Sequence, residues 1–123
     1  MKQAKKVFLV DDDKIYLYVT QQNFHKKFPK IAVYSFMSGQ EALIALELNI
    51  PDILFLDLNM PVMDGWEFLE ELSKKKMLQY PDIYITTSSI DIFDKEKAAN
   101  HPLVKGYIEK PLTVEKISKV LFS

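Results

Sequence analysis

The sequence contains no cysteine and no arginine, since its sixteen basic residues are all lysine. Without cysteine there is no disulfide framework and no thiolate zinc site, and His25 and His101 have no metal-ligand spacing. Without arginine the chain lacks the guanidinium fork that binds guanine edges and clamps phosphates. With 17 Asp plus Glu, the net charge is −1. We therefore expect neither a transition-metal site nor nucleic-acid binding.

Long apolar runs are also missing, because a membrane-spanning helix needs roughly 20 apolar residues and every run here is far shorter. No signal-type apolar segment follows Met1 to Lys6. We expect a soluble, cytoplasmic protein without membrane association. A length of 123 residues suits one core. Residues 1–123 are predicted to form a single domain, with no output domain.

Short β-type runs alternate with helix-period stretches along the whole chain. Five consecutive pairs of strand and helix imply a parallel sheet covered by helices on both faces, because parallel strands need crossover connections. The predicted strands are 7–10, 31–36, 53–56, 83–86 and 106–109, and the predicted helices are 14–27, 39–48, 65–76, 90–99 and 113–122.

The polarity of the runs predicts the order of the strands. Val7 to Val10 and Ile53 to Leu56 are continuously apolar, which is typical of strands buried on both faces. The runs 31–36 and 106–110 include polar residues, which is typical of edge strands. The order 2-1-3-4-5 satisfies both observations. We predict an α/β protein with a flavodoxin-like (βα)5 fold, a doubly wound five-stranded parallel sheet.

Several polar residues are explained by helix capping alone. The segments 38–41 (SGQE) and 64–67 (DGWE) predict capping boxes, and Thr113 is a plausible N-cap of the last helix. Asp13 is expected to cap the first helix. We assign these residues, Asp64 included, to structure.

The acidic residues that capping leaves unexplained follow two central strands. Asp11 and Asp12 follow the first strand and Asp57 follows the third, at the point where the strand order reverses and open α/β sheets bind ligands. Three carboxylates so close either raise their pKa values or hold a cation. An all-oxygen set selects a hard ion, and Mg²⁺ fits best.

Glycine spacing argues against the familiar nucleotide-binding loops. Gly39, Gly65 and Gly106 lie too far apart for a G-x-G-x-x-G loop or a G-x-x-x-x-G-K-[ST] loop. An acidic run after the first strand would also repel a flavin phosphate. Dinucleotide, nucleoside triphosphate and flavin binding are therefore not expected.

Four segments together resemble the receiver domain of two-component response regulators, in the single-domain form of chemotaxis receivers. They are VFLVDD (7–12), LDLNMPVMDG (56–65), ITTSS (85–89) and GYIEKP (106–111). The resemblance implies a phosphoacceptor that is loaded by a sensor histidine kinase or a phosphotransfer protein. It further implies phosphorylation-dependent docking to a downstream protein, which we expect on the fourth helix, fifth strand and fifth helix.

The resemblance also implies roles for the acidic residues. Asp57 is identified as the phosphoacceptor. Asp12, Asp57 and the backbone carbonyl of Asn59 would hold Mg²⁺, with Asp11 reaching the ion through water. A carboxylate is a weak nucleophile, but phosphoryl transfer requires mainly positioning and charge neutralisation.

Further roles fall on the later strands. Thr87 would hydrogen-bond the phosphoryl group, Tyr107 would move when Thr87 does, and Lys110 would pair with the phosphoryl group. Asn59 and Ser89 border the path of the attacking water in this family, so they would tune the phosphoryl lifetime. The bond from Lys110 to the proline after it resembles the family's cis peptide.

One segment departs from the family pattern. Where a Gly-Ala pair is expected to close the fourth helix, residues 100–105 read NHPLVK. The extent of that helix and the register of the last strand are therefore left open. Ser88 replaces a small apolar residue, which is a minor change.

Two other functions remain open at this point. A haloacid-dehalogenase-like phosphohydrolase would also use Asp57 as a nucleophile, but it would need a second acid where this chain has Asn59. A degenerate receiver would act only as a binding module. We expect a signalling domain and not an enzyme, one that catalyses at most its own phosphorylation and dephosphorylation.

Overall fold

The computed structural model describes residues 4–89 and 91–122. Its five parallel strands form one sheet in the order β2-β1-β3-β4-β5, which confirms the predicted order and fold. The strands are β1 (Lys6–Val10), β2 (Ala32–Phe36), β3 (Ile53–Leu56), β4 (Asp82–Thr87) and β5 (Val104–Glu109). The helices are α1 (Lys14–Lys27), α2 (Gly39–Leu48), α3 (Gly65–Lys74), α4 (Ile92–Ala99) and α5 (Val114–Leu121).

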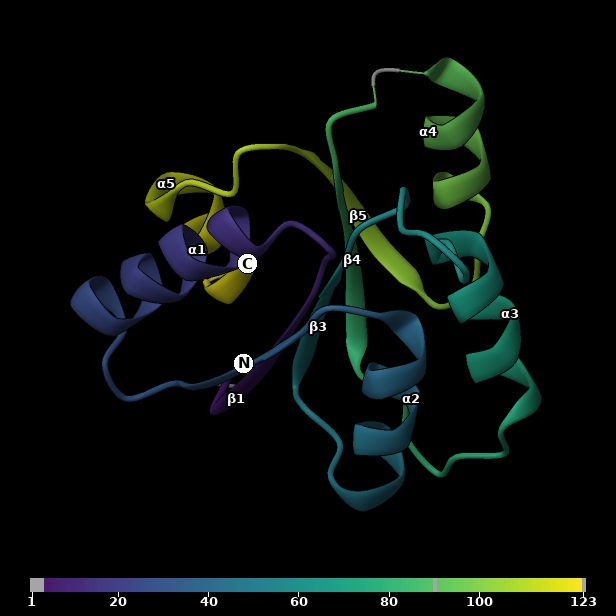
Figure 1. Cartoon of the computed structure of the whole chain (residues 1–123), viewed down its shortest axis with the longest axis horizontal. Coiled ribbons are helices and arrows are strands. Elements are labelled where there is room, and N and C mark those ends of the chain that lie inside the picture. The colour runs from purple at the N-terminus through teal and green to yellow at the C-terminus, as the bar shows by residue number, and fades with distance from the viewer. Residues whose placement is uncertain (1–3, 90, 123) are drawn as a thin grey trace.

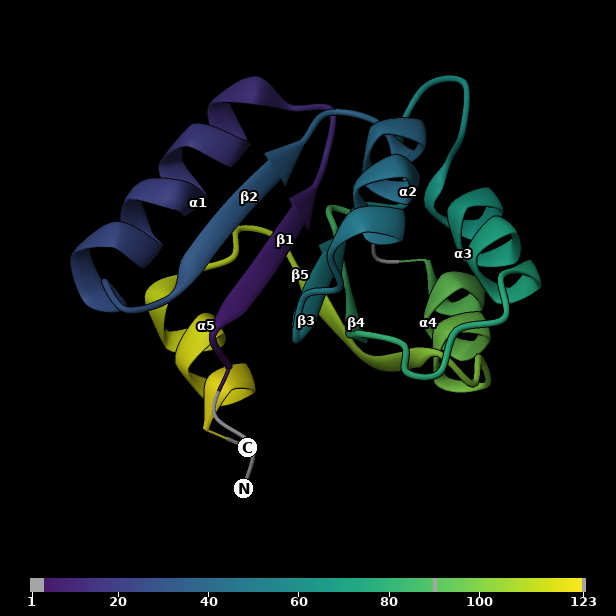
Figure 2. The same ribbon diagram turned by 90° about the horizontal axis from the view of Figure 1, so that it is seen from below.

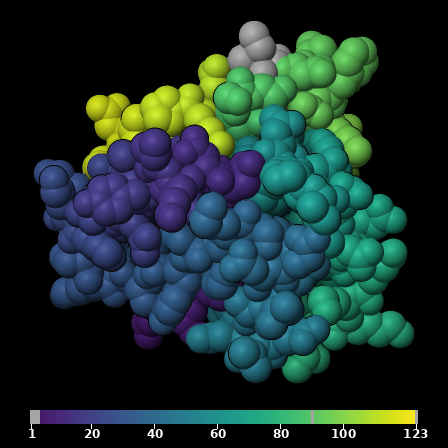
Figure 3. Space-filling model, in the orientation of Figure 1, coloured from purple at the N-terminus to yellow at the C-terminus, as the bar shows by residue number. Residues whose placement is uncertain are grey.

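Helices cover both faces of the sheet, with α1 and α5 on one face and α2, α3 and α4 on the other (Figures 1 and 2). In the space-filling view, the yellow of α5 adjoins the purple of the β1–α1 segment, and the teal of α3 adjoins the green of α4 (Figure 3). Among the described residues, no helix combines the length and hydropathy needed to cross a bilayer.

The central strands are apolar on both sides because each side meets a helical layer. Val7 and Leu9 pack in the cluster that includes α1 and α5 residues, whereas Phe8 and Val10 pack in the cluster that includes α2 and α3 residues. All four side chains are buried. The alternation of successive side chains across a strand therefore explains the continuous apolar runs.

Capping fixes where the helices begin, largely as predicted. The Asp64 carboxylate accepts from the Glu67 N–H while the Glu67 carboxylate accepts from the Asp64 N–H, which completes a capping box. At α2 the prediction was only half right. The Ser38 hydroxyl accepts from the Glu41 N–H but donates to the Glu41 carboxylate, so that carboxylate bonds the hydroxyl and not the backbone.

Helix α3 ends earlier than the predicted residue 76. Its C-cap, Lys75, has an extended backbone and bonds its N–H to the Leu72 carbonyl. The Lys75 ammonium pairs with Glu47 of α2 at 2.8 Å, and the Lys75 carbonyl accepts from the Tyr80 hydroxyl. These contacts to other segments replace the last predicted turn.

The segment that departs from the family pattern closes α4 at Ala99. The Asn100 and His101 N–H groups donate to the Glu96 and Ala98 carbonyls, which completes the last turn before Pro102. Strand β5 then starts at Val104, two residues before the predicted start, with a register shift opposite β4. The predicted first residue of the fourth helix, residue 90, lies outside the described residues.

Candidate functional site

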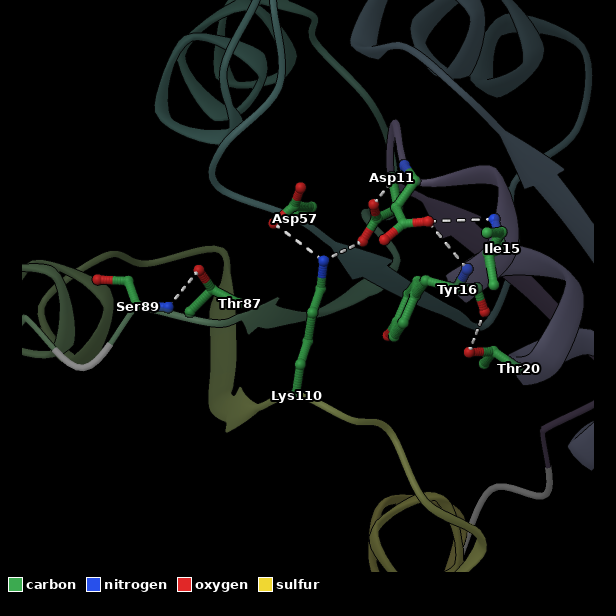
Figure 4. A network of polar contacts seen from close by, with 9 residues as sticks. Asp11, Ile15, Tyr16, Thr20, Asp57, Thr87, Ser89 and Lys110 are labelled. Atoms are coloured by element: carbon green, nitrogen blue, oxygen red, sulfur yellow. Dashed lines mark hydrogen bonds and ion pairs between the residues drawn. The ribbon is translucent and has the colours of Figure 1, made fainter.

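Strand register brings the carboxyl ends of β1, β3, β4 and β5 to one edge of the sheet. Val10 pairs with Leu56, so the residues that follow them, Asp11 and Asp57, are neighbours. Backbone hydrogen bonds extend the pairing, since the Asp57 N–H donates to the Val10 carbonyl at 2.9 Å and the Lys110 N–H donates to the Thr87 carbonyl at 2.9 Å. Figure 4 shows the side chains that converge there.

The three predicted acidic residues form a cluster. Asp11, Asp12 and Asp57 each offer a carboxylate oxygen, and these atoms lie within 4.8 Å of one another. Asp11 is 1% exposed and Asp57 is 3% exposed, whereas Asp12 is exposed. Burying carboxylates costs free energy unless a charge compensates them. The all-oxygen donor set therefore fits a hard cation such as Mg²⁺.

Burial also changes the acidity of the cluster. It raises the pKa of Asp57 to about 6, and the negative charge of Asp11 adds to the rise, while Lys110 and the Asn59 backbone N–H oppose it. Burial raises the pKa of Asp11 as well, against a hydrogen bond from Lys110. Burial is the largest cause of both shifts, and the neighbouring carboxylates add to them.

Lys110 is the cation that the protein itself supplies. Its ammonium lies 2.6 Å from Asp11 Oδ2 and 3.5 Å from Asp57 Oδ1. Burial lowers the pKa of Lys110, but the two carboxylates outweigh burial and the net direction is upward. The peptide bond between Lys110 and Pro111 is cis, as the resemblance implied.

Thr87, Ser89 and Tyr107 are joined by hydrogen bonds. The Thr87 hydroxyl oxygen, which is buried, accepts from the Ser89 N–H at 3.1 Å. The Tyr107 hydroxyl donates to the Ser89 carbonyl at 3.0 Å. The predicted switch residues therefore meet through the backbone of one residue in the β4–α4 loop.

The two residues predicted to tune lifetime have different surroundings. Asn59 is exposed, and its backbone N–H bonds the Asp57 carboxylate. The Ser89 hydroxyl donates to Asp94 Oδ2 at 3.2 Å and accepts from the Asp91 N–H at 3.2 Å. The side chain of Ser89 is thus held by α4 and its N-cap.

Two site residues were not found from the sequence. The ring of Tyr16 lies beside Lys110, with the ammonium 4.4 Å from the ring centroid (Figure 4). Gly65 begins α3 behind the acceptor, where a Cβ would lie 2.6 Å from the Asp57 backbone oxygen. The cap at Asp13 could have placed Tyr16 in the first turn of α1, next to the acidic run.

Comparison with known proteins assigns most of the chain to one kind of domain. Residues 7–122 match the family model described as the response regulator receiver domain. The alkaline phosphatase synthesis transcriptional regulatory protein PhoP of Bacillus subtilis is 32% identical over 91 residues, which are 74% of this chain and 36% of that protein. The chain thus spans only about a third of PhoP.

Solved structures agree over nearly the whole chain. A two-component response regulator from Cytophaga hutchinsonii superposes with a TM-score of 0.84 at 26% identity, covering 97% of this chain and 95% of that one. The phosphorylated cyanobacterial phytochrome response regulator RcpA has a TM-score of 0.79 at 27% identity, covering 95% of this chain and 88% of that one.

Proposed function

Since the chain belongs to the family of response regulator receiver domains, we propose that it accepts a phosphoryl group on Asp57 and signals through the resulting change of shape. The observation that carries this proposal is the juxtaposition of a buried carboxylate with two further carboxylates and an ammonium. Asp57 shares the 4.8 Å cluster with Asp11 and Asp12, and Lys110 lies 3.5 Å away. Phosphorylation of the similar protein RcpA supports the proposal.

The reaction is an in-line transfer between a phosphohistidine and a carboxylate. An oxygen of Asp57 attacks the phosphorus and forms an O–P bond as the N–P bond to imidazole breaks. The products are an acyl phosphate and a free histidine, which takes up a proton from solvent. The donor is a sensor histidine kinase or a phosphotransfer protein, as the family implies. Such transfers depend mostly on positioning and electrostatic stabilisation.

Phosphoryl transfer also requires positive charge, which the acidic cluster cannot supply. Asp11, Asp12, Asp57 and the backbone carbonyl of Asn59 would hold Mg²⁺, which supplies positive charge for the equatorial phosphoryl oxygens. Lys110 supplies the remaining positive charge. Because its ammonium is closer to Asp11 than to Asp57, we expect it to shift from Asp11 towards the phosphoryl group.

The switch follows from the bonds around Ser89. The Thr87 hydroxyl already accepts a hydrogen bond from the Ser89 N–H. When the same hydroxyl donates to a phosphoryl oxygen, it draws the loop that contains Ser89 inward. The Tyr107 hydroxyl is bonded to the carbonyl of the same Ser89. A movement of that loop therefore has to change the position of Tyr107 or break its hydrogen bond.

A docking surface lies next to this switch. On α4, Ile92 is 63% exposed and Phe93 is 74% exposed. A groove between α4 and β5 is lined by Lys95, Ala98 and Tyr107, among others. We propose that the downstream partner is a protein that binds this surface, which is part of the α4–β5–α5 face expected from the family resemblance. The single-domain organisation, the cytoplasmic location and the absence of nucleic-acid binding stay predictions.

Intact-mass spectrometry after incubation with Mg²⁺ and acetyl phosphate tests the proposal. We expect one acid-labile phosphate per chain and a slow release of phosphate. Sustained, multiple-turnover release from simple phosphate esters would favour the phosphohydrolase. A chain that binds Mg²⁺ but takes no phosphate would be a degenerate receiver that acts only in binding.

A further inference from the structure

We infer that Tyr16 is a positioning residue, whose ring holds the Lys110 ammonium in the site while that ammonium changes its anionic partner. The Lys110 ammonium is 4.4 Å from the centroid of the Tyr16 ring. It also lies 2.6 Å from Asp11 and 3.5 Å from Asp57. The role of Tyr16 in phosphorylation rests on the proposed function, whereas the contact between Tyr16 and Lys110 does not.

Tyr16 is fixed relative to the acidic cluster by a short series of hydrogen bonds. The Asp13 N–H donates to Asp11 Oδ1 at 2.9 Å, and Asp13 Oδ1 accepts from the Tyr16 N–H at 3.1 Å. The Tyr16 carbonyl accepts from the Thr20 hydroxyl at 2.7 Å. The backbone that carries the ring is therefore tied to the residue that pairs with Lys110.

The ring acts as a neutral π-face and not as a counter-ion. Burial raises the pKa of Tyr16 to about 12, so the phenol keeps its proton near pH 7. An ammonium over such a face is stabilised by the ring quadrupole, and more strongly when it is desolvated. The Lys110 side chain is 18% exposed. An aliphatic side chain in place of Tyr16 would not compensate the hydration that the Lys110 ammonium loses on burial.

The π-face of Tyr16 matters because the other two partners of Lys110 are proposed metal ligands. A cation held by Asp11 and Asp57 would compete with the ammonium for the same two carboxylates. The attraction of the ring does not depend on a free carboxylate. Tyr16 can therefore retain Lys110 beside Asp57 between its release from Asp11 and its pairing with the phosphoryl group.

The test compares two variants that lack a ring, Tyr16→Leu and Tyr16→Met, with Tyr16→Phe, which keeps the ring and loses only the hydroxyl. The first measurement is the NMR signal of the Lys110 ε-methylene protons. We expect a ring-current shift to high field in wild type and Tyr16→Phe, and its loss in Tyr16→Leu and Tyr16→Met. An identical signal in wild type and both ring-less variants overturns the inference.

The second measurement is the rate of labelling by acetyl phosphate with saturating Mg²⁺, together with Mg²⁺ affinity from calorimetry. The ring-less variants should be labelled about three- to tenfold more slowly, which is the range of a partly desolvated cation–π contact. Tyr16→Phe should stay within about twofold of wild type. None of the three variants should bind Mg²⁺ more weakly than wild type. Lys110 competes with the metal for Asp11, so an ammonium that is held less firmly in the site does not weaken Mg²⁺ binding.

Several outcomes would overturn the inference. Unchanged labelling in the ring-less variants, or an equal loss in Tyr16→Phe, would remove the ring from the mechanism. A parallel fall in Mg²⁺ affinity would reduce Tyr16 to a support of the local fold. A wild type that takes no phosphate contradicts the proposed function instead, and the Lys110 signal then decides separately whether the ring holds the ammonium.

Discussion

At the scale of single residues, the site is governed by charge that the fold brings together. Asp57 is held beside Asp11 by the pairing of β1 with β3, and both residues are almost completely buried. Lys110 relieves part of the repulsion from a position nearer to Asp11. The remaining negative charge is a cost of the folded state, because an unfolded chain lets the carboxylates separate.

This cost predicts how stability depends on pH. Burial and Asp11 raise the folded-state pKa of Asp57 from 3.8 to about 6. The folded state therefore binds more protons than the unfolded state between these values, and stability falls as pH rises through that window. The loss approaches about 3 kcal/mol for the full shift and is complete above pH 6.

Urea titrations in chelator at pH 4 and pH 7 check this prediction with Asp57→Asn beside wild type. At pH 7 the variant should have the higher midpoint, by about 1–3 M for an ordinary urea m-value. At pH 4 the two midpoints should converge, since wild-type Asp57 is then protonated. A variant that is less stable than wild type at pH 7 would show that the carboxylates do not repel one another as described.

At the scale of elements, the loops after β3 and β4 are held by hydrogen bonds to neighbouring segments. Helix α3 starts directly behind the acceptor, and the Gly65 N–H donates to the Leu58 carbonyl at 2.9 Å. The β4–α4 loop is held at Ser89, which bonds Thr87, Tyr107 and Asp94. These contacts connect the site to the helix that bears the proposed docking surface.

Two glycines at helix starts should respond differently to alanine. A Cβ at Gly65 would lie 2.6 Å from the Asp57 backbone oxygen, whereas a Cβ at Gly39 would lie 2.8 Å from the flexible Met63 side chain. Gly65→Ala should lower the free energy of unfolding by about 1–3 kcal/mol, as overpacking does. Gly39→Ala should be close to neutral in the same denaturation experiment. Equal effects would contradict the close approach of α3 to the acceptor.

The loop around Ser89 predicts a separation of phosphorylation from switching. Thr87→Ala should still take up phosphate, more slowly, but it loses the hydroxyl that can draw in the loop. The amide signals of Ser89 and Tyr107 should shift on phosphorylation in wild type and stay nearly unchanged in Thr87→Ala. NMR spectra of both proteins, with and without acetyl phosphate, decide this. Equal shifts would reject the coupling through Thr87.

Substitution of Ser89 should change the phosphoryl lifetime more than it changes the affinity for Mg²⁺. Ser89→Ala removes the bonds to Asp94 and to the Asp91 N–H, which costs about 1 kcal/mol of stability for the lost hydrogen bonds. The decay of the phosphorylated mass measures the lifetime directly. Unchanged decay across several Ser89 variants would contradict this role.

At the scale of the whole molecule, the sequence predicted the features that depend on periodicity and on strand ends. Continuous apolar runs at 7–10 and 53–56 indicated two of the three interior strands, and the acids after them met at one edge. Two side-chain contacts between segments distant in sequence were not predicted. The pairing of Lys75 with Glu47 that accompanies the early end of α3, and the approach of Lys110 to Tyr16, depend on packing that local patterns do not encode.

A ligand that binds the folded state stabilises the molecule as a whole. If the dissociation constant of Mg²⁺ is about 1 mM, a tenfold excess adds about 1.4 kcal/mol to the free energy of unfolding. The gain should be smaller in Asp57→Asn, which offers one carboxylate fewer. Paired urea titrations with chelator and with Mg²⁺ measure both gains. Identical gains would mean that the three acids do not share one site.

The most direct test of the account is the mass of Asp57→Asn after incubation with Mg²⁺ and acetyl phosphate. Asp64→Asn is the matched control, because it makes the same substitution at another aspartate, one that caps α3, and leaves the cap competent. We predict one acid-labile phosphate on wild type and on Asp64→Asn, and none on Asp57→Asn, with the same circular dichroism for all three. Undiminished labelling of Asp57→Asn would contradict the assignment of Asp57 as the phosphoacceptor.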